Sequence, residues 1–225
     1  MKSIPVLGTL ALLACGNLAA QASEPVEWIT DPAELAARGF DPDGPPIQRL
    51  IIEPDTRPLA ERLAERELIE TSVDVGGGNV RWASVQATDF MLLGDEAAYT
   101  TQGNFNFSCL AGAPTNLFAD APIHFRDDRR LRFFDVWTHD SSASGDVEVL
   151  LYRVCQPAFT AEAPVVTELA SRSSTGSGGN QFSFVSIPGM VHSQNSICSY
   201  WVRTRFPNCT AGIDLKVLKA RVVWD

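Results

Sequence analysis

The chain has 225 residues, of which 45% are hydrophobic, and its 18 Lys and Arg against 27 Asp and Glu give a formal net charge of −9. This composition is too apolar for a disordered chain, and the length allows one or two domains. The acidic balance argues against a nucleic-acid partner, because binding phosphates requires a basic surface.

Residues 1–22 have the composition of a secretory signal peptide. Lys2 is followed by an apolar stretch from Ile4 to Ala14, and Ala20-Gln21-Ala22 forms an A-x-A cleavage pattern before Ser23. The segment is too short for a permanent membrane helix, and no later run approaches the roughly 18 apolar residues of a membrane span. We therefore expect an exported protein, periplasmic or extracellular, that begins at Ser23 and has no transmembrane segment.

A lipoprotein is the alternative. Leu12-Leu13-Ala14-Cys15 resembles a bacterial lipobox, which would make Cys15 the lipid-anchored first residue. Against this, the segment before Cys15 is short, and Leu13 fits the middle position of a lipobox poorly.

Four cysteines follow the signal peptide: Cys109, Cys155, Cys198 and Cys209. An even number in an exported chain predicts two disulfides. The sequence has no C-x-x-C pair and no His at the spacing of a zinc ligand, so we do not expect these cysteines to bind a metal. We expect no cofactor.

Residues 23–70 differ from the rest and predict a partly helical N-terminal extension. Thr30–Gly39 has a Thr or Asp cap, Pro in the first turn and Gly at the end, which predicts a short helix. A strand is expected over Arg49–Glu53. Thr56–Leu68 is expected to be helical, with Leu59 and Leu63 four residues apart. The extension has too few apolar residues to fold alone, so it must pack on the larger body or stay mobile.

Residues 71–225 form a series of short segments separated by Gly, Ser, Asn, Asp and Pro. Short strands without intervening helices predict a mostly β fold, an antiparallel, jelly-roll-like β-sandwich. Leu131–Trp137 and Val147–Val154 are apolar on both faces, so these strands are expected to be central or covered by the N-terminal extension. The predicted strands are Asn79–Gln86, Tyr99–Cys109, Ile123–Arg126, Leu131–Thr138, Val147–Cys155, Val165–Ser171, Phe182–Ile187, Cys198–Phe206 and Ile213–Trp224.

The alternating direction of antiparallel strands predicts which cysteines pair. Cys155 and Cys209 are then expected at one edge and Cys198 at the other, so a strand of roughly 25–30 Å separates Cys198 from Cys209. Because the Cα atoms of a disulfide lie within about 7 Å of each other, we predict Cys155–Cys209 and, by elimination, Cys109–Cys198. The strands taken to alternate are Leu131–Thr138, Val147–Cys155, Phe182–Ile187, Cys198–Phe206 and Ile213–Trp224.

The strand Cys198–Phe206 has one apolar face, expected in the core, and one face that carries Trp201, Arg203 and Arg205. These three residues are candidate binding residues, because carbohydrate-binding sandwiches use exposed aromatic side chains as stacking platforms beside hydrogen-bonding groups. The alternative is that the N-terminal helices pack over Trp201, or that Arg203 shields it by a cation–π contact.

The loop Asp140–Glu148 resembles a calcium loop. Its oxygen-bearing side chains include Asp140, Ser142, Ser144 and Asp146. Leu151 stands where such a loop carries a bidentate Glu, and Ser replaces two carboxylates. We therefore favour a hairpin turn held by Asp and Ser side chains, with no calcium requirement.

No residue is predicted to be catalytic. The three histidines are His124, His139 and His192, and Ser177, which Gly residues flank, lies in a low-complexity loop. The G-x-S-x-G pattern of a nucleophile elbow is absent from the sequence.

Five short sequence patterns follow one another between Ala121 and Trp224. They are the aromatic-rich strand that runs into Asp140-Ser141-Ser142-Ala143-Ser144, then Leu151-Tyr152-Arg153, the Ser/Gly-rich Ser173–Gly179, Tyr200-Trp201-Val202-Arg203 and the closing strand Ala220–Trp224. In these patterns the chain resembles a recurring β-sandwich domain of exported bacterial proteins of unknown function. The resemblance implies a β-sandwich and export, and it implies no activity.

These patterns predict an exported, non-catalytic binding or cell-envelope surface module, with a glycan or another envelope component as its ligand. The alternative is a secreted hydrolase or a calcium-dependent enzyme whose site is assembled from loops, which spacing arguments cannot detect. An exposed Trp201 flanked by polar groups favours the first; carboxylates and a His converging in one cleft favour the second.

Overall fold

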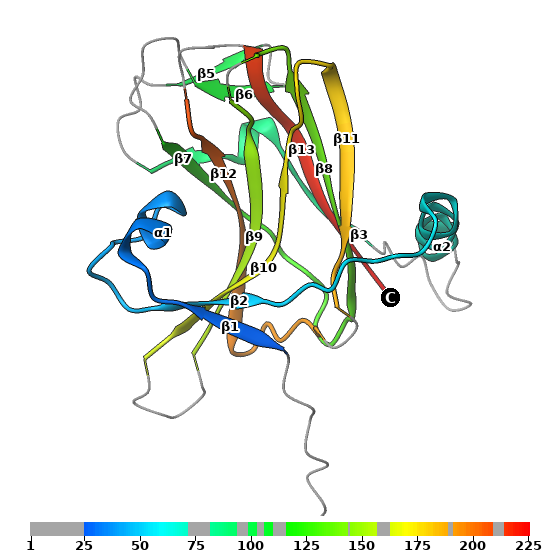
Figure 1. The fold of residues 1–225 in the computed structure, drawn as a ribbon. Coiled ribbons are helices and arrows are strands. Elements are labelled where there is room, and N and C mark those ends of the chain that lie inside the picture. The colour runs from blue at the N-terminus through cyan, green and yellow to red at the C-terminus, as the bar shows by residue number, and fades with distance from the viewer. Residues whose placement is uncertain are drawn as a thin grey trace, which may run out of the picture.

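The computed structural model describes residues 25–71, 82–93, 99–102, 106–109, 116–143, 145–156, 163–188, 191–208 and 214–225. The predicted signal peptide, Cys15, Ser23, Ser144, and Cys209 lie outside the described residues. Two β-sheets pack face to face in Figure 1, which confirms the predicted β-sandwich. In the described part of the chain, no helix is long and apolar enough to cross a membrane.

The first sheet has seven strands. Adjacent strands in it run antiparallel, except that β2 and β10 are parallel to each other. In spatial order its strands are β1 (Val26–Ile29), β2 (Ile47–Leu50), β10 (Val165–Ser173), β9 (Glu148–Cys155), β12 (Cys198–Phe206), β7 (Leu117–Pro122) and β4 (Met91–Leu92).

The second sheet has six strands: five form one path, and the sixth, β3 (Trp82–Gln86), lies off that path and pairs with β13. In spatial order the five strands of the path are β11 (Gly179–Ser186), β8 (Leu131–Asp140), β13 (Leu215–Trp224), β6 (Asn106–Cys109) and β5 (Tyr99–Gln102). The segment predicted as one strand over Tyr99–Cys109 is thus two strands that pair with each other. The strand predicted at Ile123–Arg126 is wrong, because the ladder to β12 ends at Pro122.

The main core lies between the two sheets. Alternate residues of β12 point into it, and Val202 and Phe206 are fully buried there, as the period-two pattern of this strand predicts. Phe134 and Val136 of β8 meet them from the second sheet. The strands β8 and β9 are also apolar on their outer faces, and the N-terminal segment covers the outer face of β9 and part of that of β8.

The N-terminal segment is built into the sandwich. β1 and β2 extend the edge of the first sheet, and α1 (Pro32–Ala37) lies against the outer face of that sheet (Figure 1). Asp31 caps α1 by accepting a hydrogen bond from the backbone N–H of Glu34, at 2.8 Å. Gly39 ends the helix in the left-handed conformation, at φ 74°, where a side chain is disfavoured. The second helix, α2 (Leu59–Thr71), lies on the second sheet.

The disulfide joins Cys155 and Cys198, so both predicted bridges, Cys155–Cys209 and Cys109–Cys198, are wrong. The two cysteines face each other across the antiparallel pair β9 and β12, with Cα atoms 4.1 Å apart. The prediction failed because the alternation of strand directions left out Val165–Ser171, which is β10. When β10 is counted, the expected direction of β12 is reversed. The start of β12, with Cys198, then lies beside the end of β9, with Cys155.

Candidate functional site

Trp201 lies beneath the N-terminal segment. Its ring stacks on Tyr152 of β9 with the ring centroids 5.3 Å apart, and Phe40 packs edge-on against the same tyrosine. Both Trp201 and Tyr152 belong to a second apolar cluster that includes side chains of β1, α1 and β2. Trp201 is therefore not an exposed stacking platform. The structure agrees with the alternative expectation, in which the N-terminal segment covers it.

Arg203 clamps this segment onto the first sheet. Its side chain is 5% exposed and donates hydrogen bonds to both carboxylate oxygens of Asp120, each at 2.7 Å. The same guanidinium donates to the backbone carbonyls of Arg38 and Gly39 at 2.9 and 3.1 Å. It also lies 4.7 Å from the ring centroid of Phe40. One buried cation thus holds the end of α1 in place.

Arg205 lies further along β12 and makes separate contacts. It pairs with Glu148 at 3.3 Å and donates to the side-chain oxygen of Asn116 at 2.9 Å. The structure therefore does not gather Trp201, Arg203 and Arg205 into one exposed site.

The loop after β8 is held by a buried carboxylate. Asp140 accepts hydrogen bonds from the backbone N–H of Ser142 at 3.0 Å and from the Ser174 hydroxyl at 2.6 Å. Burial and the charge of Asp140 raise the pKa of Asp146 above its usual range. Among the described residues, no group of three or more His, Cys, Asp and Glu side chains is placed to hold a metal.

The histidines lie apart from one another. His139 is hydrogen-bonded to Asn180 at 2.8 Å, and His192 lies 3.6 Å from the carboxylate of Asp128 on the surface. His124 is exposed in the segment after β7. Within the described ranges, none of the three is hydrogen-bonded to a serine hydroxyl, as the base of a nucleophilic triad would be.

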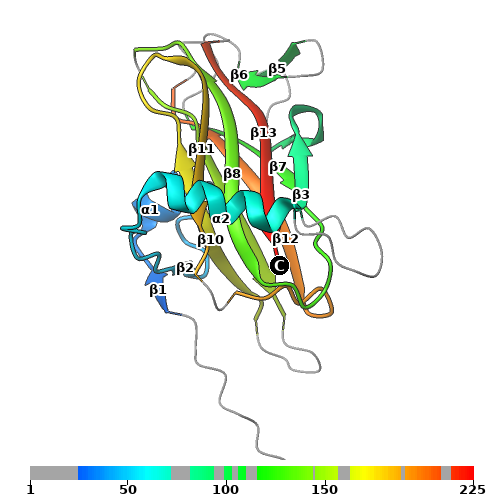
Figure 2. The ribbon, with the colours of Figure 1, turned by 90° about the vertical axis from the view of Figure 1, so that its right-hand side faces the viewer.

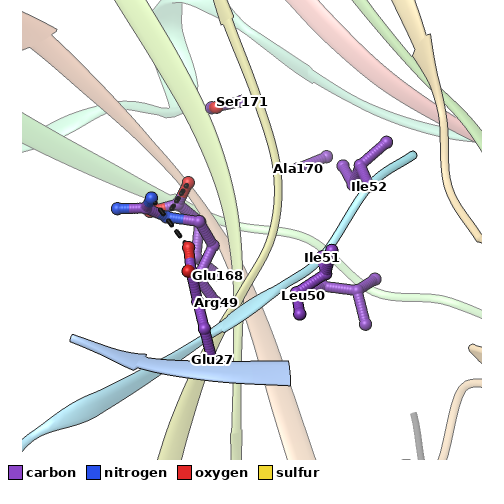
Figure 3. A pocket seen from close by; sticks show the side chains of 8 residues that line it. All are labelled: Glu27, Arg49, Leu50, Ile51, Ile52, Glu168, Ala170 and Ser171. Atoms are coloured by element: carbon purple, nitrogen blue, oxygen red, sulfur yellow. Dashed lines mark hydrogen bonds and ion pairs between the residues drawn. The ribbon is translucent and has the colours of Figure 1, made fainter. Parts of the chain in front are cut away.

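A buried glutamate lies beside a cavity of about 330 Å³ at the outer edge of the first sheet. Glu168 of β10 accepts a hydrogen bond from Arg38 at 2.8 Å, and Arg49 lies 3.7 Å from its other oxygen (Figure 3). The Tyr152 hydroxyl donates to it at 3.4 Å. Burial raises the pKa of Glu168, although the two arginines oppose that shift.

Sequence spacing could not have revealed this carboxyl group, because its partners come from α1, β2 and β9. A raised pKa is what a general acid needs. Here, however, both oxygens of Glu168 face partners from the protein, and Arg49 also pairs with Glu27 at 2.9 Å. Glu168 and its two arginines therefore form an ion cluster that joins the N-terminal segment to the sheet.

The outer face of the second sheet carries five residues that we call the aromatic face: Trp82, Trp137, Phe182, Lys219 and Arg221. Strand register brings them together, because Trp137 of β8 lies opposite Phe182 of β11 on one side and Lys219 of β13 on the other. Trp82 is 39% exposed and Phe182 is 42% exposed.

Aromatic rings and cations alternate across this face. The ring centroids of Trp137 and Phe182 are 4.8 Å apart. The ammonium of Lys219 lies 5.4 Å from the centroids of both Trp82 and Trp137, and the guanidinium of Arg221 lies 5.1 Å from Trp137. The cations therefore lie between the two indole rings, and they hold the rings in fixed positions.

Helix α2 crosses in front of β11, β8 and β13, which belong to the same sheet, as Figure 2 shows. Arg66 of α2 and Arg221 both donate to the carboxylate of Asp135, which is fully buried. Under the helix lies a cluster of Phe133, Phe184 and Val223, all buried. The helix thus covers one part of the sheet surface and leaves Trp82 and Phe182 partly exposed beside it.

The helix itself rests on the sheet through arginines rather than leucines. Leu59 is 55% exposed and Leu63 is 37% exposed, although their spacing of four predicts a single apolar stripe. Arg62 and Arg66 instead lie over the rings of Phe184 and Phe182, each at 5.3 Å. Cation–π contacts and ion pairs with the sheet replace the apolar packing expected of this helix.

Sequence reasoning placed Trp82, Trp137 and Phe182 in predicted strands but missed the site that they form. Alternation within β11 shows that Phe182 and Phe184 share a face, and this is a usable signal. The spacing of residues within one strand does not reveal the register between strands that lie far apart in the sequence.

No protein-family model matches the chain, and no curated protein matches it significantly. An exo-β-1,3-galactanase from Phanerochaete chrysosporium is similar in fold over 62% of this chain, with 9% identity and a TM-score of 0.32; the chain spans 28% of that protein. TmCBM61, solved with β-1,4-galactotriose, matches 63% of this chain and 83% of its own, with 9% identity and a TM-score of 0.28. The CBM22-2 xylan-binding domain of Xyn10C from Paenibacillus barcinonensis covers 63% of this chain and 94% of its own, at 8% identity and a TM-score of 0.30. At these TM-scores, none of the three carries an argument about what this chain binds.

Proposed function

We propose that this protein is an exported, non-catalytic glycan-binding module and that the aromatic face is its binding surface. The observation that carries the proposal is the exposure of Trp82 and Phe182 on either side of Trp137, next to cations on the same sheet face. Export is supported by the signal-peptide pattern of residues 1–22.

Exposed aromatic rings held in place by their neighbours suit a sugar ligand. A pyranose ring offers an apolar face of C–H groups, and an aromatic ring can cover it at little cost in side-chain entropy, because the ring has two side-chain torsions. Phe182 is fixed between Trp137 and Phe184 by ring contacts at 4.8 and 6.0 Å. Preorganised rings of this kind lose little freedom when a ligand binds.

The charges on this face favour an acidic glycan over a neutral one. Arg66 and Arg221 both donate to the carboxylate of Asp135, and Lys219 forms no ion pair with a carboxylate among the described residues. The aromatic face thus presents two cationic side chains, Lys219 and Arg221, on a chain whose formal net charge is −9. Carboxylate or sulfate groups on a polysaccharide would be attracted to it, and that attraction weakens as salt rises.

Affinity electrophoresis and titration calorimetry against neutral and acidic polysaccharides test the proposal. Phe182→Ala and Trp82→Ala are each expected to weaken binding about tenfold, equal to about 1.4 kcal/mol. Trp28→Ala is the matched control, because Trp28 is also exposed, at 53%, but lies on β1 at the edge of the other sheet.

The control variant is expected to bind as the unaltered chain does. Equal losses in Trp28→Ala and Phe182→Ala, or no binding to any polysaccharide, would refute the aromatic face as a glycan site. Trp fluorescence of the unaltered chain gives an independent readout, because a sugar over Trp82 shields its indole from water.

A further inference from the structure

A second cavity, of about 410 Å³, lies at the open side of the sandwich between β10 and β11. The segment that leads from β2 to α2 lines one side of it with residues 52–55, and Figure 1 shows that segment crossing in front of both strands. Arg172, Ser171 and Ser186 line it from the strands, and Arg62 lines it from α2. The volume is within the range of pockets that hold small molecules.

Two guanidinium groups share this cavity. Arg172 reaches from β10 to the opposite sheet, where its Nε donates to the backbone carbonyl of Phe184 at 3.0 Å. Arg62 lies over the ring of the same phenylalanine, at 5.3 Å. The Nε of Arg62 is buried and has no hydrogen-bond partner among the described residues. Burial, and after it the charge of Arg62, lowers the pKa of Arg172, as expected for two like charges in a partly dry space.

The two carboxylates that line the cavity do not neutralise these arginines. Asp55 accepts from Arg57 through both oxygens, at 2.9 and 2.7 Å, and the Ser186 hydroxyl donates to it at 3.2 Å. Glu53 is exposed to solvent. In the described part of the chain, neither Arg62 nor Arg172 forms an ion pair with a carboxylate.

We propose that this cavity binds a small molecule through an oxyanion group, a carboxylate, sulfate or phosphate, held between Arg62 and Arg172. Guanidinium groups donate along fixed directions that match the oxygens of such groups. The hydroxyl of Ser171 supplies a further donor at the wall of the cavity. Two half-buried guanidinium groups without a carboxylate partner repel each other, and a bound oxyanion offsets that repulsion. The site is separate from the aromatic face, so neither proposal depends on the other.

Thermal melting of the full chain at constant ionic strength tests this site. Sodium sulfate, sodium phosphate and sodium glucuronate are each compared with sodium chloride, so that general screening is the same in every sample. A saturable rise of the melting temperature in an oxyanion, absent in chloride, is expected, because a ligand that binds the folded state stabilises it. Calorimetry with the most effective probe then gives the dissociation constant.

Arg62→Gln and Arg172→Gln are each expected to weaken binding at least tenfold. Arg205→Gln, which removes an arginine of β12 that does not line the cavity, is expected to leave binding unchanged. If Arg172→Gln does not fold, Arg62→Gln still decides the question. A response to sulfate and phosphate supports a site for inorganic oxyanions, and a stronger response to glucuronate supports an acidic sugar. Equal melting in all four salts, or a rise that persists in both glutamine variants, overturns the proposal.

Discussion

Replacing Arg203 by Met tests whether one buried cation fastens the N-terminal segment to the sandwich. The substitution keeps an unbranched apolar stem but removes five donors, four of which bond Asp120 and the carbonyls of Arg38 and Gly39. Breaking a buried ion pair from one side costs about 3–5 kcal/mol. Because the Asp120 side chain is 22% exposed and water can reach it, we take the lower end of that range.

The expected loss is therefore about 3 kcal/mol in the free energy of unfolding, or about 6–12 °C in melting temperature for a domain of this size. Chemical denaturation followed by tryptophan fluorescence measures it, and Trp201 reports directly on the covered face. A second expected change is faster proteolysis within the segment around α1, because the clamp on that helix is gone.

Arg205→Met is the matched control on the same strand. Its ion pair with Glu148 joins side chains that are each about a quarter exposed, so its loss is expected to cost about 0–1 kcal/mol. If Arg203→Met and Arg205→Met differ by less than about 1 kcal/mol, the clamp described here does not hold the segment, and the covering of Trp201 rests on apolar packing alone.

Three further predictions concern the crosslink, a buried acid and a turn. Peptide mapping without reduction should yield a linked Cys155–Cys198 peptide, and replacing both cysteines by Ser should cost about 4 kcal/mol for a separation of 43 residues; a Cys155–Cys209 peptide would contradict the structure. Because burial raises the folded-state pKa of Glu168 above the usual 4.5, the folded chain keeps a proton that the unfolded chain has released. The unfolding free energy of the unaltered chain should therefore fall, relative to Glu168→Gln, as pH rises above about 4.5, and a constant difference across pH would contradict this. Gly39→Ala should cost about 2–4 kcal/mol, because a Cβ there would lie 2.8 Å from the Phe118 ring at a positive φ, whereas Gly176→Ala, at φ 60° in open space, should cost about 1 kcal/mol; equal costs would show that the ring gives way.

Local patterns were enough for much of the fold. The strand Cys198–Phe206 has the predicted bounds, and Asp31 and Gly39 delimit the first helix as capping rules require. The short strand β1 was missed because four residues beside Pro25 give no clear period-two signal. Its existence depends on β2, with which it pairs in register, and on the sheet edge that both extend.

The candidate sites could not be predicted in the same way. The residues next to Trp201 in the sequence are the same whether its side chain is exposed or covered. It is covered by the segment around α1, which lies more than 160 residues earlier in the sequence. The aromatic face requires the register of β11 against β8 and of β8 against β13, which no spacing within one strand contains. The predicted bridges failed for a related reason, since one uncounted strand reverses the direction of every strand after it.

The parallel pairing of β2 with β10 has a consequence for the order in which the chain folds. Gln48 meets Thr167 across this pair, 119 residues later in the sequence. During synthesis β1 and β2 emerge first, yet they have no sheet edge to join until β9 and β10 have paired. Closing so long a loop is entropically costly and slow, so β1 and β2 wait for a sheet edge that is made more than 100 residues after them. Until then, the outer surfaces of Tyr152 and Trp201 stay open to water and to other chains.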